Sequence, residues 1–370
     1  MTMNGKIGVG IIGIEPERSW AAVAHVPALR ALPDYEITAV STRRRESADA
    51  AAAVFGIDLA FDNSAELIAH PKVDLVAVTV KVPHHLELVT AALAAGKKVY
   101  CEWPLARTLE EAIVMAEQAR QAGIRCMIGL QARLAPVVDY VRALVRDGYV
   151  GEVLSTTLVG SGMQWGNEVD RPNAYIVDKA NGATMLTIPM GHTIDALCHC
   201  LGEFRSLSAT TAIRQPLVTR TDTGEILTKT AEDQIVIGGV LESGAVASIH
   251  YRGGTSRGTK LLWEINGTEG DLQITADGGH GQIFDLTLAG GRGGDRMLRQ
   301  MPVPPEHRWV PKDLAGPAVN VAQAYARYAA DLRDGTRLCA DFDDAVRRHR
   351  MIAAIEESAA SGRRVSMEQG

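Results

Sequence analysis

The stretch KIGVGIIG, residues 6–13, is a short apolar run that ends at a glycine. A run of this kind predicts a strand that is buried on both faces. The next segment, 21–33, has apolar residues at helical spacing, and 35–42 reads as a second strand. A strand, a helix and a further strand in succession are typical of a βαβ unit, from which parallel sheets are built.

The same alternation continues along the first third of the chain. We expect further strands at 73–80, 98–103 and 125–131, with helices at 43–56, 84–97 and 108–123. Strands that are apolar throughout indicate a sheet covered by helices on both faces. The sequence therefore predicts an N-terminal Rossmann domain, a doubly wound parallel sheet, over residues 1–135. Its ligand would bind at the carboxyl ends of the strands.

Beyond about residue 150 the pattern changes to one of alternating polar and apolar residues. Alternation predicts antiparallel strands with one exposed face, here at 152–160, 232–242, 244–254 and 260–267. We therefore expect an α/β protein whose second domain, 136–370, is an α+β domain with a large open, mostly antiparallel sheet. The helical patterns at 319–334 and 342–361 predict closing helices within about 319–370 that pack near the first domain. The glycine-rich stretch 289–295 is expected to be a loop.

Composition and charge exclude several classes of protein. A net charge of −6 provides no general attraction to nucleic acid or anionic membranes. No apolar run approaches the roughly 18 residues of a membrane span, and the first six residues lack the apolar core of a signal peptide. Five cysteines are too few for a disulfide framework, which favours the cytoplasm. No metal site is expected, because Cys198, His199 and Cys200 have no second cluster at zinc-site spacing.

The end of the first predicted strand suggests a dinucleotide. Gly13 stands where a nucleotide-binding fold turns tightly under the pyrophosphate, and Ile14 follows it. The usual run of three glycines is not intact, so Gly13 can also be read as a simple strand terminator. Ser19 and Trp20 begin the next helix, where backbone N–H groups hold phosphate.

The end of the second predicted strand, VSTRRR at 40–45, carries no acid that would bind a ribose 2′-hydroxyl. Ser41, Thr42 and Arg43 supply hydroxyls and a guanidinium suited to a 2′-phosphate instead. A solvated basic helix start is the alternative, and it suits Arg45. We therefore favour NADP(H) over NAD(H) as the cofactor.

Several motifs together carry a family resemblance. They are CEWPLARTLEEA at 101–112, GLQARLAP at 129–136 and GHTIDALCHCLGE at 191–203. With the N-terminal half, they resemble the Gfo/Idh/MocA oxidoreductases over nearly the whole chain. ERSWAAVAH at 17–25 and Glu-Trp in place of the family's Glu-Lys resemble the Gal80-like branch, whose fungal members are NADP-binding transcriptional repressors.

The resemblance implies roles for individual residues. Glu102 would accept hydrogen bonds from the nicotinamide ribose, and the C-terminal sheet would pack in a homodimer or homotetramer. The family's catalytic lysine is replaced by Trp103, whose indole can stack on a ring but cannot exchange a proton near neutral pH. The family's aspartate four residues before the helix histidine aligns with Ile188. The histidine itself is retained as His192, and the following aspartate as Asp195.

Proton transfer would then fall to other groups. His192 titrates near neutral pH and is the candidate proton relay, with a satisfied core histidine as the alternative. Lys81 leaves the tip of a central strand and is the candidate replacement donor, or else a solvated lysine. Asp195 lies on the same helix face as His192, so that it either orients the imidazole or bonds a neighbouring backbone group.

The remaining candidates line the same strand ends. Val80 and Val82 flank Lys81 and are assigned to the cofactor site. His85 opens the following helix, with core packing as its alternative role. Gln131 is assigned to the cofactor. Two residues are candidate substrate ligands: Arg133, which could instead form a salt bridge between domains, and Tyr175.

Three functions remain open from the sequence. The first is an NADP(H)-dependent oxidoreductase that acts on a sugar, polyol or related hydroxy or keto compound. The second is a Gal80-like, non-catalytic protein that senses NADP(H) and binds a partner protein. The third is an enzyme that uses a bound nicotinamide for internal redox.

Overall fold

The computed structural model describes residues 5–367. The chain divides into two compact units. The first comprises the chain up to Gln131 together with Trp309–Arg347, and the second comprises Ala132–Arg308 with the residues after Arg347. Each unit is built around its own sheet.

The first unit contains a six-stranded parallel sheet with the strand order β3-β2-β1-β4-β5-β6. Its strands are β1 (Ile7–Ile12), β2 (Tyr35–Ser41), β3 (Leu59–Phe61), β4 (Leu75–Val78), β5 (Lys98–Glu102) and β6 (Cys126–Gly129). Every residue of β1 and β4 is buried, as expected for strands covered on both faces. The sequence prediction of a doubly wound sheet is confirmed.

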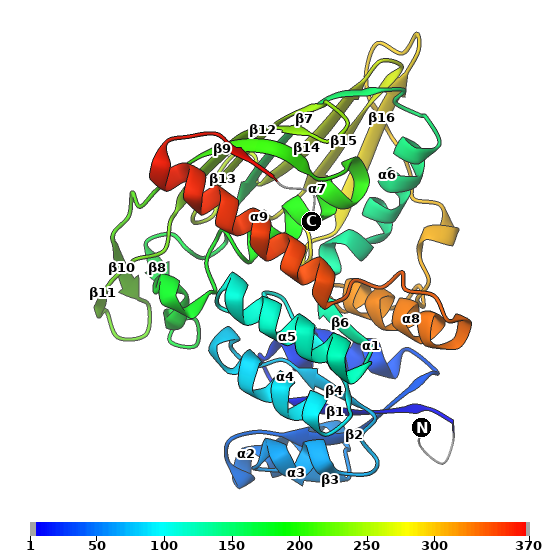
Figure 1. Cartoon of the computed structure of the whole chain (residues 1–370), viewed down its shortest axis with the longest axis vertical. Helices are drawn as coiled ribbons and strands as arrows, with labels where there is room; N and C mark the ends of the chain where they lie inside the picture. The colour runs from blue at the N-terminus through cyan, green and yellow to red at the C-terminus, as the bar shows by residue number, and fades with distance from the viewer. Residues whose placement is uncertain (1–4, 368–370) are drawn as a thin grey trace. The chain divides into compact units, whose positions relative to one another are not determined.

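Helices connect and cover these strands. They are the π-helix η1 (Ala21–His25), α1 (Val26–Arg30), α2 (Arg45–Phe55), α3 (Ser64–Ala69), the 3-10 turn η2 (Val82–His84), α4 (His85–Ala94), α5 (Leu109–Ala122) and α8 (Ala318–Asp334). Helices α4 and α5 pack side by side, and α8 packs against α1 and η1 (Figure 1). The strand order reverses between β1 and β4, and a doubly wound sheet opens its ligand crevice at such a point.

The second unit contains a nine-stranded sheet, mixed but mostly antiparallel, with the order β17-β16-β15-β14-β7-β13-β12-β9-β18. Its strands are β7 (Val153–Ser161), β9 (Phe204–Ala212), β12 (Gln234–Leu241), β13 (Val246–Arg252), β14 (Leu261–Gly267), β15 (Gly270–Ala276), β16 (Leu286–Arg292), β17 (Arg299–Gln300) and β18 (Val365–Ser366). Along β12 buried and more exposed residues alternate, so that one face of the sheet is covered. The prediction of an α+β fold is confirmed.

Smaller elements complete the second unit. They are a sheet of β8 (Glu168–Val169), β10 (Leu217–Arg220) and β11 (Ile226–Thr228), the helices α6 (Pro136–Arg146) and α7 (Pro189–Leu201), and the 3-10 turns η3 (Gln131–Leu134), η4 (Ala174–Val177), η5 (Lys179–Asn181) and η6 (Pro305–His307). Helix α9 (Phe342–Ser361) contributes its first residues to the first unit and the rest to the second. Helices α6 and α7 pack on each other.

One local prediction is wrong. The expected loop at 289–295 begins within β16, whose residues up to Arg292 pair with β15. A side chain at Gly290 would place its Cβ 2.4 Å from the sulfur of Met301. Glycine is present at 290 because Met301, Leu272 and Tyr149 leave no room for a side chain. Only 293–295 of the stretch lie outside the strand.

The five cysteines are thiols without disulfide bonds. Burial raises the pKa of Cys126 to about 12, and it also raises the pKa values of Cys101, Cys198 and Cys200. Among residues 5–367, no group of three or more His, Cys, Asp or Glu side chains is arranged to hold a metal ion. No helix in that range is both long and apolar enough to cross a bilayer.

Candidate functional site

Gly13 follows β1 directly and closes a tight turn. Its φ of +98° belongs to the region that favours glycine. A Cβ atom at this position would lie 2.5 Å from Cγ1 of Val80 and 3.1 Å from the Val80 nitrogen. The Gly13 N–H donates to the carbonyl of Ser41. The ends of β1, β2 and β4 therefore meet at Gly13, where Val80 leaves no room for a side chain.

The turn after Gly13 is held by Ser19. Its hydroxyl donates to the Glu15 carbonyl at 2.7 Å and accepts from the Glu15 and Ala22 N–H groups. Ile14 is buried beneath this turn. Trp20 leads into η1, and its Nε1 is buried without a hydrogen-bond partner among the described residues. This indole N–H is a donor at the carboxyl edge of the sheet.

The tip of β2 presents Thr42 and Arg43. Ser41 is buried, and the Thr42 hydroxyl donates to the Arg44 carbonyl and lies 2.6 Å from the Ser47 hydroxyl. Thr42 therefore shapes the start of α2. Arg43 is exposed, and its Nη2 is hydrogen-bonded to Nε2 of His84, a residue that sequence reasoning did not single out.

Lys81 follows β4 and is the N-cap residue of η2. Partial burial, followed by repulsion from Arg43, lowers the pKa of its ammonium group. The two cations are therefore electrostatic neighbours at the carboxyl edge, between the tips of β2 and β4.

The His85 side chain lies inside the first unit. Its Nε2 lies 2.9 Å from the Val80 carbonyl, and its Nδ1 lies 3.0 Å from the Pro104 carbonyl. Burial lowers the pKa of this imidazole, against the effect of these carbonyls. Val82 is also buried. His85 joins the turn after β4 to the turn after β5, and its role toward a cofactor stays a prediction.

Glu102, the last residue of β5, is the centre of a polar network. Its Oε1 lies 2.8 Å from Nε2 of His25 and 2.9 Å from Nε2 of Gln131, which also donates to Oε2 at 2.7 Å. The Glu102 side chain keeps 13% of its surface exposed, while His25 is fully buried. The carboxylate is thus held from behind and open on one side.

The network continues away from Glu102 through aromatic residues. Nδ1 of His25 lies 2.8 Å from the Tyr325 hydroxyl, and the rings of Tyr325 and Tyr100 stack with centroids 5.0 Å apart. With a neutral ring and an ionised carboxylate, one assignment satisfies both bonds: the Tyr325 hydroxyl donates to Nδ1, and Nε2–H donates to Glu102.

Sequence reasoning missed His25 and Tyr325. A histidine inside the apolar segment AAVAHVPAL was the available signal. His25 ends a π-helix, an uncommon geometry that is frequent at functional sites.

Trp103 is only 4% exposed. The Trp103–Pro104 peptide bond is cis. The indole therefore belongs largely to the packed interior of the turn after β5, and no titratable group occupies that position.

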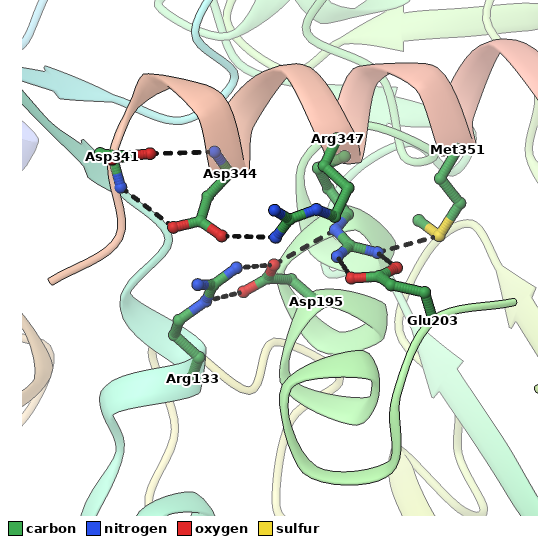
Figure 2. A network of polar contacts seen from close by, with 8 residues as sticks. Arg133, Asp195, Glu203, Asp341, Asp344, Arg347 and Met351 are labelled. Atoms are coloured by element: carbon green, nitrogen blue, oxygen red, sulfur yellow. Dashed lines mark hydrogen bonds and ion pairs between the residues drawn. The ribbon is translucent and has the colours of Figure 1, made fainter. Parts of the chain in front are cut away.

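The second unit contains the other four predicted residues, and two of them form an ion pair. Nε and Nη2 of Arg133 donate to the two carboxylate oxygens of Asp195 at 2.7 and 2.5 Å. Figure 2 shows Arg133 and Asp195 facing each other in this pair. Arg348, from the part of α9 in the second unit, reaches Asp195 at 3.2 Å and Glu203 at 2.6 Å. Burial opposes ionisation, but the guanidinium of Arg133 and then that of Arg348 hold the pKa of Asp195 below its ordinary value.

This arrangement bears on two predicted roles. Both oxygens of Asp195 are engaged by guanidinium groups, and Arg133 is engaged within its own unit rather than between units. The network links η3, α7 and α9. Its geometry is that of a structural ion-pair cluster, while the proposed catalytic and substrate roles of these residues stay predictions.

His192 is buried in α7 and has a second histidine, His280, as its electrostatic neighbour. Burial, followed by repulsion from His192, lowers the pKa of His280 to about 3. The His280 ring lies 5.7 Å from that of Trp165. Tyr175 is half-buried in η4, and burial raises its pKa. Sequence reasoning did not identify His280.

The carboxyl edge of the first unit fits the expected dinucleotide. Gly13 makes the tight turn that a pyrophosphate needs, at a position where Val80 leaves no room for a Cβ. Besides the Trp20 N–H, the Oε1 of Gln131 is buried without a hydrogen-bond partner among the described residues. Buried donors and acceptors of this kind are normally satisfied, so both atoms suit a polar ligand.

Comparisons with known proteins agree with this chemistry. A family model described as "Oxidoreductase family, NAD-binding Rossmann fold" matches residues 7–130, and one described as "Gal80p, C-terminal domain" matches 136–276. Dehydrogenase aclE of Aspergillus oryzae is 32% identical, across 97% of this chain and 98% of that protein.

One further relative and one solved structure of similar fold complete the comparison. The galactose/lactose metabolism regulatory protein GAL80 of Saccharomyces cerevisiae is 29% identical, across 81% of this chain and 74% of that protein. The structure of levoglucosan dehydrogenase in complex with NADH and L-sorbose has a TM-score of 0.86 at 23% identity, across 99% of this chain and 100% of that one.

Proposed function

The chain belongs to the Gfo/Idh/MocA oxidoreductase family and has a Gal80p-type C-terminal domain, and from this we propose that it is an NADP(H)-dependent oxidoreductase acting on a sugar, polyol or related hydroxy or keto compound. Relatives that include a dehydrogenase, and a fold neighbour whose complex holds NADH and a sugar, support the reaction class.

One observation carries the preference for NADP(H). At the tip of β2 the exposed side chain is Arg43, hydrogen-bonded to His84, with a second cation, Lys81, as its electrostatic neighbour. NAD-preferring folds place an acid at this tip to bind the ribose 2′-hydroxyl, whereas an arginine accommodates a 2′-phosphate. Position and charge therefore favour the phosphorylated dinucleotide.

The residues that would hold the cofactor line the carboxyl edge. Gly13, Ile14, Ser19 and Trp20 form the turn for the pyrophosphate. Ser41, Thr42 and Arg43 stand at the adenosine end, with Val80, Val82 and His85 packed beneath. Glu102, Trp103 and Gln131 stand at the nicotinamide end. When bound, the cofactor supplies the hydride donor or acceptor.

This chain's own residues must move the substrate proton. We assign His192 the role of proton relay, because an imidazole changes charge near neutral pH. Lys81 is the candidate replacement for the absent family lysine, since burial and Arg43 lower its pKa and so ease proton release. Trp103 would shape the site and keep water out. Glu102 would orient a hydroxyl, and Arg133, Tyr175 and Asp195 are the remaining candidates on the substrate side.

A non-catalytic, NADP(H)-sensing role of the Gal80 kind is the second candidate. The position of the family lysine holds Trp103, which cannot exchange a proton near neutral pH. A general acid–base group commonly contributes about 10²–10⁴-fold in rate, so its loss is costly if no group replaces it. A GAL80 regulator is also among the relatives.

We further propose a cytoplasmic homodimer or homotetramer formed through the nine-stranded sheet. Val236 on β12 and Val246 on β13 are 45% and 57% exposed on the same face of that sheet. Exposed apolar side chains on one sheet face suit a subunit interface. Light scattering on the purified protein tests this, and a monomer would contradict it.

The decisive experiment combines calorimetry with turnover. NADPH should bind more tightly than NADH, and a panel of sugars, polyols and their keto forms should change the absorbance of added NADP(H). Binding without turnover on the whole panel supports the regulatory role. Substrate conversion without net cofactor change supports internal redox. Equal affinity for the two nucleotides would overturn the preference for NADP(H).

A further inference from the structure

Arg43 and His84 come from two different strand ends but contact each other. Arg43 follows β2, and His84 ends η2, the turn that follows β4. Nη2 of Arg43 donates to Nε2 of His84. Because a protonated imidazole has no free acceptor, this hydrogen bond requires the neutral ring. In its neutral form His84 therefore fixes the position of an otherwise exposed guanidinium.

The surroundings of His84 are mostly cationic. Arg43 faces it from the tip of β2 and Lys81 from the N-cap of η2, while Glu87, in the first turn of α4, is the opposing anion. Partial burial, followed by Arg43, lowers the pKa of the His84 imidazole, and Lys81 lowers it further. Three basic side chains thus gather at the carboxyl ends of β2 and β4, where the adenosine end of a dinucleotide would lie.

We propose that His84 is a specificity-determining residue for the 2′-phosphate, an inference that rests on the proposed preference for NADP(H). In its neutral form it positions Arg43 to pair with the phosphate. In its protonated form it no longer accepts this hydrogen bond, but it adds a further positive charge beside Arg43 and Lys81. His84 and Arg43 together then select NADP(H) over NAD(H), and this selectivity increases as the pH falls.

The sign of the pH effect follows from proton linkage. A bound phosphate replaces cationic repulsion with attraction, and so raises the pKa of His84 in the complex above that in the free protein. The complex then binds more protons than its components, so affinity for NADPH rises as the pH falls through the pKa of the complex. The phosphate's own second ionisation, near pH 6, opposes this rise and must be controlled for.

Four proteins and two nucleotides provide the test. The affinities of NADPH and NADH are measured by calorimetry between pH 6 and 8 for the wild type, His84→Ala, His84→Gln and Arg45→Ala. The glutamine keeps a hydrogen-bond acceptor for Arg43 but does not titrate. Arg45, which pairs with Asp49, is the matched control for loss of a nearby positive charge. Circular dichroism confirms that each variant is folded.

We expect His84→Ala to weaken NADPH binding about tenfold at pH 7 and NADH binding less than about twofold. His84→Gln should match the wild type at pH 8 and bind NADPH more weakly than the wild type at pH 6, since the phosphate titrates equally in both. Arg45→Ala should leave the ratio of NADPH affinity to NADH affinity unchanged at each pH.

The outcomes separate this inference from the proposed function. If the wild type prefers NADPH but His84→Ala leaves that preference intact, His84 has no such role and the inference is overturned. Parallel pH profiles for wild type and His84→Gln would overturn its charged-state part. If the wild type binds both nucleotides equally, the proposed cofactor preference itself fails.

Discussion

Nε2 of His25 lies 2.8 Å from Oε1 of Glu102, although the two residues are 77 positions apart in the chain. His25 ends a π-helix and Glu102 ends β5, so the contact ties the helix after the glycine turn to the carboxyl end of β5. Replacing His25 with leucine removes the donor that, with Gln131, fixes the carboxylate. We expect both NADPH and NADH to bind about tenfold more weakly in calorimetry.

A tyrosine pair supplies the control for this prediction. Tyr325→Phe removes the hydroxyl that faces Nδ1 of His25, whereas Tyr328→Phe on the same helix removes one that donates to the Arg125 carbonyl. Only Tyr325→Phe should weaken nucleotide binding. If both variants bind equally well, the network does not act through Glu102.

Trp20 provides an optical probe of the glycine turn. Its buried Nε1 has no hydrogen-bond partner among the described residues, and it lies at the helix start expected to hold phosphate. We expect NADPH to quench the intrinsic fluorescence, and Trp20→Phe to remove a measurable part of that quenching. The comparison variant is Trp309→Phe, because the Trp309 ring stacks under Arg327 and not at the glycine turn. An unchanged quench in Trp20→Phe would count against this placement of the cofactor.

His192 is the residue on which the enzymatic proposal depends most. His192→Gln should abolish turnover of an identified substrate and leave the affinity for NADPH within about twofold, because the side chain belongs to the other unit. Lys81→Met should lower turnover by about 10²-fold if lysine is the replacement donor. Undiminished turnover in His192→Gln, measured by NADPH absorbance, would end its assignment as proton relay.

Replacement of Asp195 distinguishes a structural role of this carboxylate from a catalytic one. Asp195→Asn leaves Arg133 and Arg348 buried against a neutral amide, and should lower the free energy of unfolding by about 3 kcal/mol in urea titrations. The stabilising effect of Asp195 is present above its unfolded pKa of about 4, and is lost as the pH falls through its depressed folded value. A variant with wild-type stability but lost turnover would instead show that Asp195 orients His192.

His280 makes the stability of the second unit depend on pH. Its pKa is about 3 in the folded protein, because of burial and then His192, against about 6.5 when unfolded. Between these values only the unfolded state takes up the proton, so stability falls as the pH is lowered below 6.5. This group should contribute a loss of about 2 kcal/mol between pH 6.5 and 5. Urea midpoints of wild type and His280→Gln at both pH values check this, and equal losses would refute it.

The sequence predicted elements well where local periodicity determines them. The run 6–13 forms β1, which is apolar throughout because it is buried on both faces. The run 232–242 forms β12, which alternates because only one of its faces is buried. The glycines at 290 and 291 were wrongly interpreted as part of a loop, because the packing of Met301 against Gly290, which no local pattern records, requires glycine there.

The candidate site was predictable only in part. Gly13 and Arg43 follow predicted strands, so their place at the carboxyl edge followed from topology. The partners of the site residues could not be predicted in this way. His84 is 41 positions from Arg43, and Tyr325 is 300 positions from His25. Such contacts depend on how distant segments pack, and hydrophobic periodicity carries no information about them.

The thiols described above have a practical consequence for handling the protein. Peroxide and alkylating reagents attack the thiolate, and raised pKa values keep Cys101, Cys126, Cys198 and Cys200 protonated across the neutral range. In the folded chain these four thiols should therefore resist oxidation on storage in air and react slowly with iodoacetamide, and their rapid labelling would report unfolding.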